Sequence, residues 1–161
     1  MITTEAMKKL QNGSDVRGDA IAGVPGEDVT LVPEAVNRIA AGFAKFLAKK
    51  LNKQTSDLRI AVGHDSRVSA GMMKEAVFGG LLGQGVHVTD CGLASTPAMF
   101  MSIIFEDTHM DGSIMITASH LPYNRNGLKF FTVDGGLEKS EVKEVLTLAS
   151  GLSAMAVSSA A

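Results

Sequence analysis

A serine and a histidine stand side by side after an apolar run, and a lysine follows ten residues after the serine. Ser119 and His120 come directly after residues 113–117, and Lys129 lies near the start of the next apolar run. A serine hydroxyl is a weak nucleophile at its free pKa, so it needs a nearby base or must be held as a reactive phosphoester. A hairpin between the two runs would bring Lys129 back towards Ser119, and phosphoryl transfer is one chemistry this spacing favours.

Cations are the second requirement of such a site. A phosphoserine carries about −1.5 to −2 charges at neutral pH, and positive side chains must offset them. Lys129, Arg125 and Arg17 are the candidates. Ordinary turn chemistry is the alternative, because Ser, Asn, Pro and Gly are common turn residues and Asn126-Gly127 suits a tight turn for backbone reasons alone. The residues by themselves leave both interpretations open.

The surrounding sequence predicts the elements that would position these residues. Apolar periodicity indicates helices over 30–51, 69–82, 96–105 and 140–148, and strands over 59–63, 86–90, 113–117 and 128–133. Residues 12–29 are expected to be irregular or loosely extended. Strands that alternate with helices favour a mostly parallel sheet covered on both faces.

One strand pair departs from this pattern. The segment 118–126 is too short for a helical crossover, so the strands over 113–117 and 128–133 are expected to be antiparallel. The expected fold class is therefore α/β, a three-layer α/β/α sandwich with a mixed, mostly parallel sheet. Ligands bind beyond the carboxyl ends of parallel strands in such folds, where residues 64–67 and the segment after Ser119 lie.

Composition restricts the classes of partner. The chain has 161 residues, is 45% hydrophobic and 20% charged, and carries a formal net charge of −2. This suits one globular domain and gives no basic field, so we expect no nucleic-acid partner. No run reaches the roughly 20 apolar residues of a membrane span. Cys91 is the one cysteine, which excludes an internal disulfide and favours a reducing intracellular compartment.

Three motifs resemble those of one enzyme family. Residues 117–129, TASHLPYNRNGLK, resemble the active-site serine loop of the α-D-phosphohexomutases, which include phosphoglucomutase, phosphomannomutase and phosphoglucosamine mutase. Residues 12–18 resemble the N-terminal element of that family, and residues 62–67 resemble its Gly-x-Asp-x-Arg turn. Six residues of the serine loop fall in register with the family signature, namely Ser119, His120, Pro122, Asn126, Gly127 and Lys129.

The resemblance assigns roles to four residues. Ser119 would carry the phosphoryl group that moves between the 1- and 6-positions of a hexose phosphate through a bisphosphate intermediate. Arg17 would contact this phosphate, and Lys129 would act beside it in proton transfer and charge compensation. His120 would lie close by, either hydrogen-bonded or in proton transfer.

The resemblance gives four further residues a supporting part. Asp65 and Arg67 would either brace the loops or contact a ligand, since a Gly-x-Asp-x-Arg turn can equally be an internal ion pair. Arg125 and Asn126 would support or bind the phosphate.

The resemblance also implies what this chain leaves out. Residues 1–150 would form domain I, and residues 151–161 would form a flexible tail. The metal loop, the sugar-recognition loop and the arginine-rich phosphate clamp of domains II–IV have no counterpart here. Mg²⁺ would contact the phosphate of Ser119 but take its other ligands from a missing domain, with hexose bisphosphate as activator. The expected partners are a hexose phosphate and the remaining domains, and the isolated domain should be inactive.

One position departs from the family signature. Leu121 stands where the family has Asn, whose amide can bond the loop backbone or the phosphate region. Either the loop is held in another way or the activity is altered. The run after Leu121 resembles a divergent branch of plants and algae, so the compartment is cytoplasm or plastid. Two rival functions remain: a serine phosphatase or other hydrolase using Ser119 and His120, and a non-catalytic, regulatory phospho-sugar-binding protein derived from a mutase.

Overall fold

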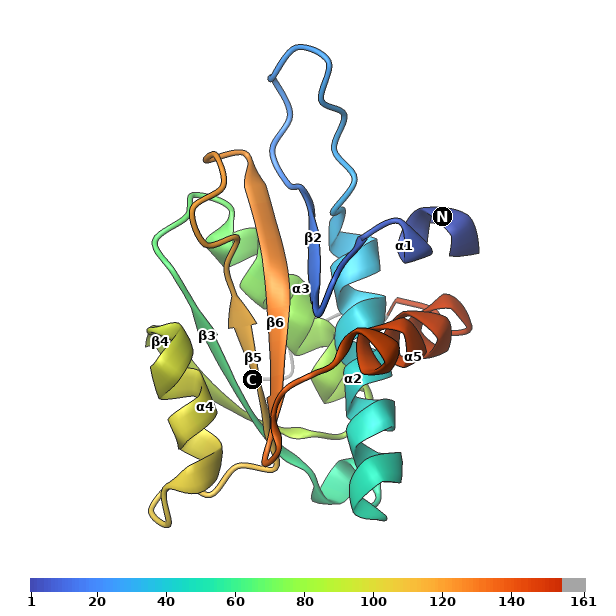
Figure 1. The fold of residues 1–161 in the computed structure, drawn as a ribbon. Coiled ribbons are helices and arrows are strands. Elements are labelled where there is room, and N and C mark those ends of the chain that lie inside the picture. The colour runs from blue at the N-terminus through green and yellow to red at the C-terminus, as the bar shows by residue number, and fades with distance from the viewer. Residues whose placement is uncertain (155–161) are drawn as a thin grey trace.

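The computed structural model describes residues 1–154, which form an α/β fold around one sheet (Figure 1). Within these residues the sheet has seven strands in the order β1-β2-β6-β5-β3-β4, with β7 paired to β6. The strands are β1 (Gln11–Asn12), β2 (Asp15–Asp19), β3 (Arg59–His64), β4 (His87–Leu93), β5 (Gly112–Ile116), β6 (Arg125–Thr132) and β7 (Gly135–Gly136). The helices are α1 (Thr4–Lys8), α2 (Pro33–Leu51), the 3₁₀ turn η1 (Thr55–Asp57), α3 (Ala70–Gly83), α4 (Thr96–Ile104) and α5 (Lys139–Ser150).

The helices cover the two faces of the sheet unequally (Figure 1). Helices α2, α3 and α5 pack on one face, where the larger apolar core forms, and α4 packs on the other face over a smaller cluster. Strand β3 supplies both, because alternate side chains point to opposite faces. Ile60 and Val62 belong to the larger core, and Ala61 contacts the cluster that contains Met99 and Met115.

The predicted α/β class, its three layers and its mixed sheet are confirmed. Parallel pairing is less frequent than the sequence predicts. Among the described strands, β3 is parallel to β4 and β5, whereas the β1–β2, β2–β6, β5–β6 and β6–β7 ladders are all antiparallel.

The difference arises mainly at the N-terminus, where residues 12–29 were expected to be irregular or loosely extended and no sheet pairing was predicted. Strands β1 and β2 are too short and polar to show a hydrophobic period, and they form because β6 offers β2 an antiparallel partner. Gly13 lies between them with φ of +60°, a conformation glycine adopts at little cost. Helix α1 was also not predicted; Thr3 caps it by accepting from Ala6 N at 3.1 Å.

The antiparallel pairing of β5 with β6 is confirmed, but β6 begins earlier than predicted. Asn126 and Gly127 therefore lie inside the strand, paired with Gly18 and Arg17 of β2, and their interpretation as a tight turn is wrong. The turn-rich composition misled because the contact with β2 determines where the strand starts. The predicted tail over 151–161 falls largely on residues 155–161, which lie outside the described residues. In the described part, no helix is both long and apolar enough to cross a membrane.

Candidate functional site

The segment 117–124, called here the serine loop, joins β5 to β6 beside the carboxyl end of β3. The two strand ends are tied directly, since Asp65 N donates to Ile116 O at 3.1 Å. Ser119 and His120 are exposed, and Ser119 has φ of +56°, an uncommon conformation for a residue with a side chain. The loop thus presents Ser119 to solvent on a backbone that its neighbours must hold in place.

Asp65 supplies part of that support through Thr117. The Thr117 hydroxyl donates to Asp65 Oδ2 at 2.7 Å and accepts from Ser119 N at 3.0 Å. Asp65 in turn accepts from the backbone N and from Nε of Arg67, at 3.2 and 3.3 Å. A continuous hydrogen-bonded path therefore leads from the β3–α3 turn to the backbone of Ser119.

Arg67 supplies the remaining support, and its side chain is only 9% exposed. Its Nη2 donates to the carbonyls of Ser119 and Leu121, at 2.8 and 2.9 Å. Its Nη1 donates to those of Pro122 and Arg125, at 2.8 and 3.1 Å. Together with Nε on Asp65, these contacts use all five N–H groups of the guanidinium. Arg67 thus has the contacts of a loop brace, and it holds the backbone of Leu121 without the amide that Leu121 lacks.

Arg17 and Lys129 meet on one carboxylate next to the loop. Arg17 Nη1 donates to Ala118 O at 2.8 Å, one residue before Ser119. Arg17 Nη2 lies 3.1 Å from Asp15 Oδ2, and Lys129 Nζ lies 3.4 Å from the same oxygen. Arg17 Nε is buried and has no hydrogen-bond partner among the described residues. Two cations are thus gathered beside the serine loop, as an anion there would require.

Gly127 allows Arg17 to reach the loop. A Cβ at this position would lie 2.3 Å from Val16 O and 2.9 Å from Arg17 Cδ, so any side chain would clash with backbone and guanidinium stem. A glycine inside a strand often marks such a close approach. Sequence reasoning missed this role, and it also missed Asp15, whose signal was its i, i+2 spacing from Arg17.

His120 contacts Ser119 but has no acid behind it. Its Nδ1 lies 3.4 Å from Ser119 Oγ, which is at the long limit of a hydrogen bond. In the described part of the chain no carboxylate bonds to His120, so the third member of a hydrolytic triad is not found there. Lys129 contacts Asp15, and its predicted approach to Ser119 stays a prediction.

Two of the expected phosphate-supporting residues point elsewhere. Asn126 is fully buried and donates to Ser69 Oγ at 2.7 Å. Arg125 Nε forms an ion pair with Asp19 Oδ1 at 3.2 Å. Burial raises the pKa of Asp19, and the charge of Arg125 opposes that rise. Ser119, His120 and Arg17 are thus brought together, with Lys129 joined through Asp15, whereas Asn126 supports the fold and Arg125 serves a neighbouring cavity.

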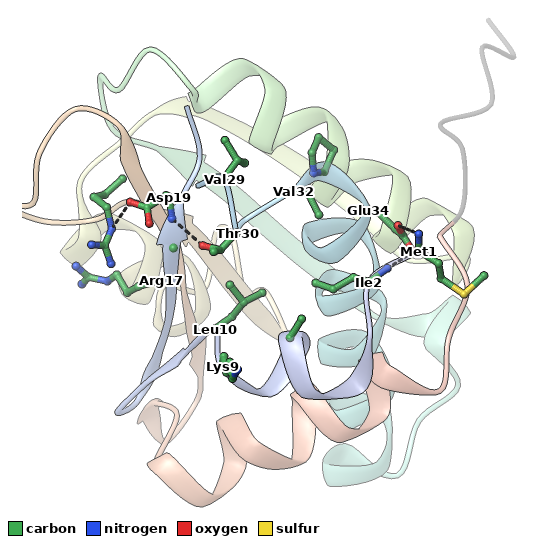
Figure 2. A pocket seen from close by; sticks show the side chains of 14 residues that line it. Met1, Ile2, Lys9, Leu10, Arg17, Asp19, Val29, Thr30, Val32 and Glu34 are labelled. Atoms are coloured by element: carbon green, nitrogen blue, oxygen red, sulfur yellow. Dashed lines mark hydrogen bonds and ion pairs between the residues drawn. The ribbon is translucent and has the colours of Figure 1, made fainter. Parts of the chain in front are cut away.

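That cavity has a volume of about 670 Å³ and lies between α1, β2 and the start of α2 (Figure 2). Figure 2 shows Arg17 and Asp19 at one end and Met1 and Glu34 at the other. Leu10 is among its apolar lining residues. Its two carboxylates are already paired, Asp19 with Arg125 and Glu34 with the amino terminus at 3.9 Å. The cavity adjoins the cation pair at Arg17 and offers no second cluster of unpaired charge.

A metal site does not form from the described residues. No three His, Cys, Asp or Glu side chains of residues 1–154 gather at one point. The carboxylates that contact this site, Asp15 and Asp65, are each paired with cationic side chains. The donor set of the described residues therefore does not fit Mg²⁺ by itself.

Comparison with known proteins identifies the family of this chain. The family model described as "Phosphoglucomutase/phosphomannomutase, alpha/beta/alpha domain I" matches residues 8–150. Phosphoglucosamine mutase of Nautilia profundicola is 38% identical over 126 residues, which are 78% of this chain and 26% of that protein. Phosphoglucosamine mutase of Lactiplantibacillus plantarum is 31% identical over 132 residues, 80% of this chain and 28% of that protein. This chain therefore spans little more than a quarter of these relatives.

A solved structure shares the fold. A phosphoglucomutase/phosphomannomutase family protein from Burkholderia thailandensis superposes with a TM-score of 0.70 at 22% identity, over 92% of this chain and 30% of that one. At this identity the likeness concerns the fold alone. The family match over residues 8–150 carries the assignment: this chain belongs to the phosphoglucomutase/phosphomannomutase family and corresponds to its alpha/beta/alpha domain I.

Proposed function

We propose that this chain is the phosphoserine-bearing domain of a phosphohexomutase, in which Ser119 carries the phosphoryl group exchanged with a hexose phosphate. The observation that carries the proposal is the placing of Ser119. Its backbone is held by Thr117 and Arg67, its side chain is exposed, and Arg17 is fixed on the preceding carbonyl. The relatives named phosphoglucosamine mutase make an amino-hexose phosphate one candidate substrate.

The proposed reaction exchanges one P–O bond for another. The P–O bond to Ser119 Oγ breaks as a P–O bond to a sugar hydroxyl forms, and the hydroxyl proton ends on Ser119 Oγ. The bisphosphate then returns its other phosphoryl group by the reverse step. Such transfer depends mainly on positioning and charge stabilisation. Arg17 and Lys129 would offset the phosphate charge, and Lys129 or His120 would move the proton at Ser119 Oγ.

The cofactor part of the proposal is limited to Ser119. A divalent cation offsets charge on the moving phosphoryl group in enzymes of this reaction class. In this chain only the phosphate on Ser119 would contact Mg²⁺, because the carboxylates of the site are paired with Arg17, Lys129 and Arg67. A hexose bisphosphate would act as activator by phosphorylating a bare Ser119.

The rival functions are less well supported. A hydrolase would need an acid that orients His120, and none bonds to it among the described residues. The case for a non-catalytic descendant rested in part on Leu121, whose backbone carbonyl is nevertheless held by Arg67 at 2.9 Å. The loop therefore keeps a fixed path despite the missing amide.

Mass spectrometry and a coupled assay test the proposal on the full-length gene product. Incubation with hexose bisphosphate should add about 80 Da, one phosphoryl unit, to the peptide that contains Ser119. Ser119→Ala should remove both the adduct and the interconversion of hexose 1- and 6-phosphates. An active enzyme phosphorylated at another residue, or a phosphate-free protein with unchanged turnover, would contradict the proposal.

A further inference from the structure

We propose that Asp15 is a positioning residue that holds Arg17 and Lys129 together while Ser119 carries no phosphate and releases them to the phosphoryl group when it does. This inference rests on the proposed function. Its direct observation is that a single oxygen, Asp15 Oδ2, contacts Arg17 Nη2 at 3.1 Å and Lys129 Nζ at 3.4 Å.

The strand register makes this arrangement part of the fold. Val16 pairs with Leu128 across the antiparallel β2–β6 ladder, and both side chains are buried in the larger core. The neighbouring positions therefore point to the opposite face, where Lys129 lies across from Asp15 and Arg17 lies two residues further along β2. Register, and not a chance rotamer, brings these three charges to one face.

Charge explains why a carboxylate is needed there. The side chains of Arg17, Asp15 and Lys129 are 11%, 15% and 31% exposed, so water screens them only in part. Two cations side by side in such a place repel each other, and one carboxylate offsets half of their charge. A phosphoserine brings about −1.5 to −2 charges, which nearly neutralises both cations by itself. Asp15 is then a second anion in the same cluster.

Arg17 can respond to this exchange without losing its place. Its Nη1 stays on Ala118 O at 2.8 Å, while Nη2 is on Asp15 and Nε has no partner in the described structure. A phosphoryl group on Ser119 would offer an acceptor to these remaining donors. Asp15 is therefore most needed in the step when the phosphoryl group has moved to the sugar and Ser119 is bare.

The experiment compares four forms of the 161-residue chain: Asp15 or Asp15→Asn, each with serine or site-specifically incorporated phosphoserine at position 119. In the serine form, Asp15→Asn should lower the melting temperature by several degrees. In the phosphoserine form the same change should lower it much less or raise it. Asp111→Asn is the matched control, because Asp111 is 16% exposed and pairs with Lys53 instead of the site. Asp111→Asn should lower the melting temperature by the same amount in the serine and phosphoserine forms.

A second readout does not depend on stability. Removal of a neighbouring anion favours the phosphate dianion, so Asp15→Asn should lower the second pKa of the phosphoserine, followed by ³¹P NMR. His120 is present in both proteins, so its contribution cancels when the variants are compared. Asp15→Glu keeps the negative charge, so the midpoint of its phosphoserine titration should lie close to that of the parent protein.

Equal losses of melting temperature in the two phosphorylation states, with an unchanged ³¹P midpoint, would overturn the role of Asp15. That result would show an ordinary structural ion pair. It would leave the proposed function standing, since phosphorylation of Ser119 in the full-length enzyme is measured separately. Conversely, the thermal and NMR coupling can be present even if the full-length protein never phosphorylates Ser119.

Discussion

Two arginines reach the serine loop from opposite sides, and they use their donors differently. Arg67, from the β3–α3 turn, places all five N–H groups on Asp65, three loop carbonyls and the carbonyl of Arg125 at the start of β6. Arg17, from β2, binds one carbonyl and one carboxylate and keeps a buried Nε without a partner among the described residues. A guanidinium whose donors are all engaged can only hold the loop. Arg17 has one donor without a partner in the described structure and a carboxylate partner that another anion can replace, so its contacts can change when a phosphate is added nearby.

Substitution of Arg67 should have the largest effect on stability. Arg67→Ala removes the guanidinium donors from three loop carbonyls, from the carbonyl of Arg125 and from the Asp65 carboxylate in a nearly buried place. We expect the free energy of unfolding to fall by about 2–4 kcal/mol. Urea unfolding measures this. Arg67→Lys is the informative control, since a single ammonium cannot make the five contacts and should recover only part of the loss. A loss below about 1 kcal/mol would show that the loop holds itself.

Substitution of Arg17 should lower stability less than substitution of Arg67 does. Relative to that loss of stability, it should lower activity more. Arg17→Ala removes two hydrogen bonds, and we expect a fall of about 1–2 kcal/mol in the free energy of unfolding. In the full-length enzyme that we propose, kcat should fall by roughly 10²–10³, as when one charge-stabilising donor is lost from an active site. Unfolding and coupled turnover assays on the same preparations compare the loss of unfolding free energy with the loss of kcat. Activity that follows stability alone would remove the distinction between the two arginines.

Ser119→Ala should barely change stability yet abolish transfer. Ser119 is exposed, and within residues 1–154 its hydroxyl contacts only His120, at long range, so we expect a change within about 0.5 kcal/mol. The φ of +56° is equally unfavourable for Ser and Ala, which keeps the comparison clean. Ser119→Gly relieves that conformation and should be slightly more stable while equally inactive. A large fall in melting temperature for Ser119→Ala would reveal a structural serine.

Much of this architecture was accessible from the sequence, for reasons that particular segments make plain. Helix α2 and strands β3 and β5 have apolar residues at a clear period, and their predicted bounds lie within a few residues of the structure. Strand β2 has no such period, because its DVRGD sequence is polar and Gly-containing, and only its pairing with β6 makes it a strand. The same contact moves the start of β6 back to Arg125 and takes Asn126-Gly127 out of the predicted turn.

In the site, too, the sequence predicts what depends on single residues and fails where contacts between distant segments decide. Ser119, His120, Arg17 and Lys129 could be named from residue types and resemblance, since each carries chemistry of its own. The roles of Asp15 and Gly127 could not be predicted, because they depend on which residues face them across β2 and β6. The bonds from Arg67 to the loop likewise depend on the approach of the β3–α3 turn, which no local pattern specifies.

The smallest expected effect concerns an exposed ion pair at the edge of the sheet, which gives a reference for the half-buried pairs of the site. Asp90 of β4 lies 2.5 Å from Lys74 of α3 and is 42% exposed. The hydrogen bond from Lys74 lowers the pKa of Asp90 most, the backbone N–H of Gly92 adds to this, and burial opposes it. A carboxyl with a lowered folded-state pKa contributes stability above its unfolded pKa of about 4 and loses it as the pH falls through the folded value.

Asp90→Asn should therefore cost less than about 1 kcal/mol at pH 7, because solvent and salt screen so exposed a pair. The cost should decrease as the pH falls below about 4 and should shrink at high ionic strength. The loss at Arg67 depends on backbone carbonyls and should persist in salt. A second readout comes from Cys91, whose thiol has a pKa raised by burial and, to a lesser extent, by the charge of Asp90. Removal of that charge should make alkylation of Cys91 faster at neutral pH, since only the thiolate reacts. An unchanged alkylation rate together with a salt-independent loss of stability would mean that Asp90 acts through packing and its Gly92 contact instead of its charge.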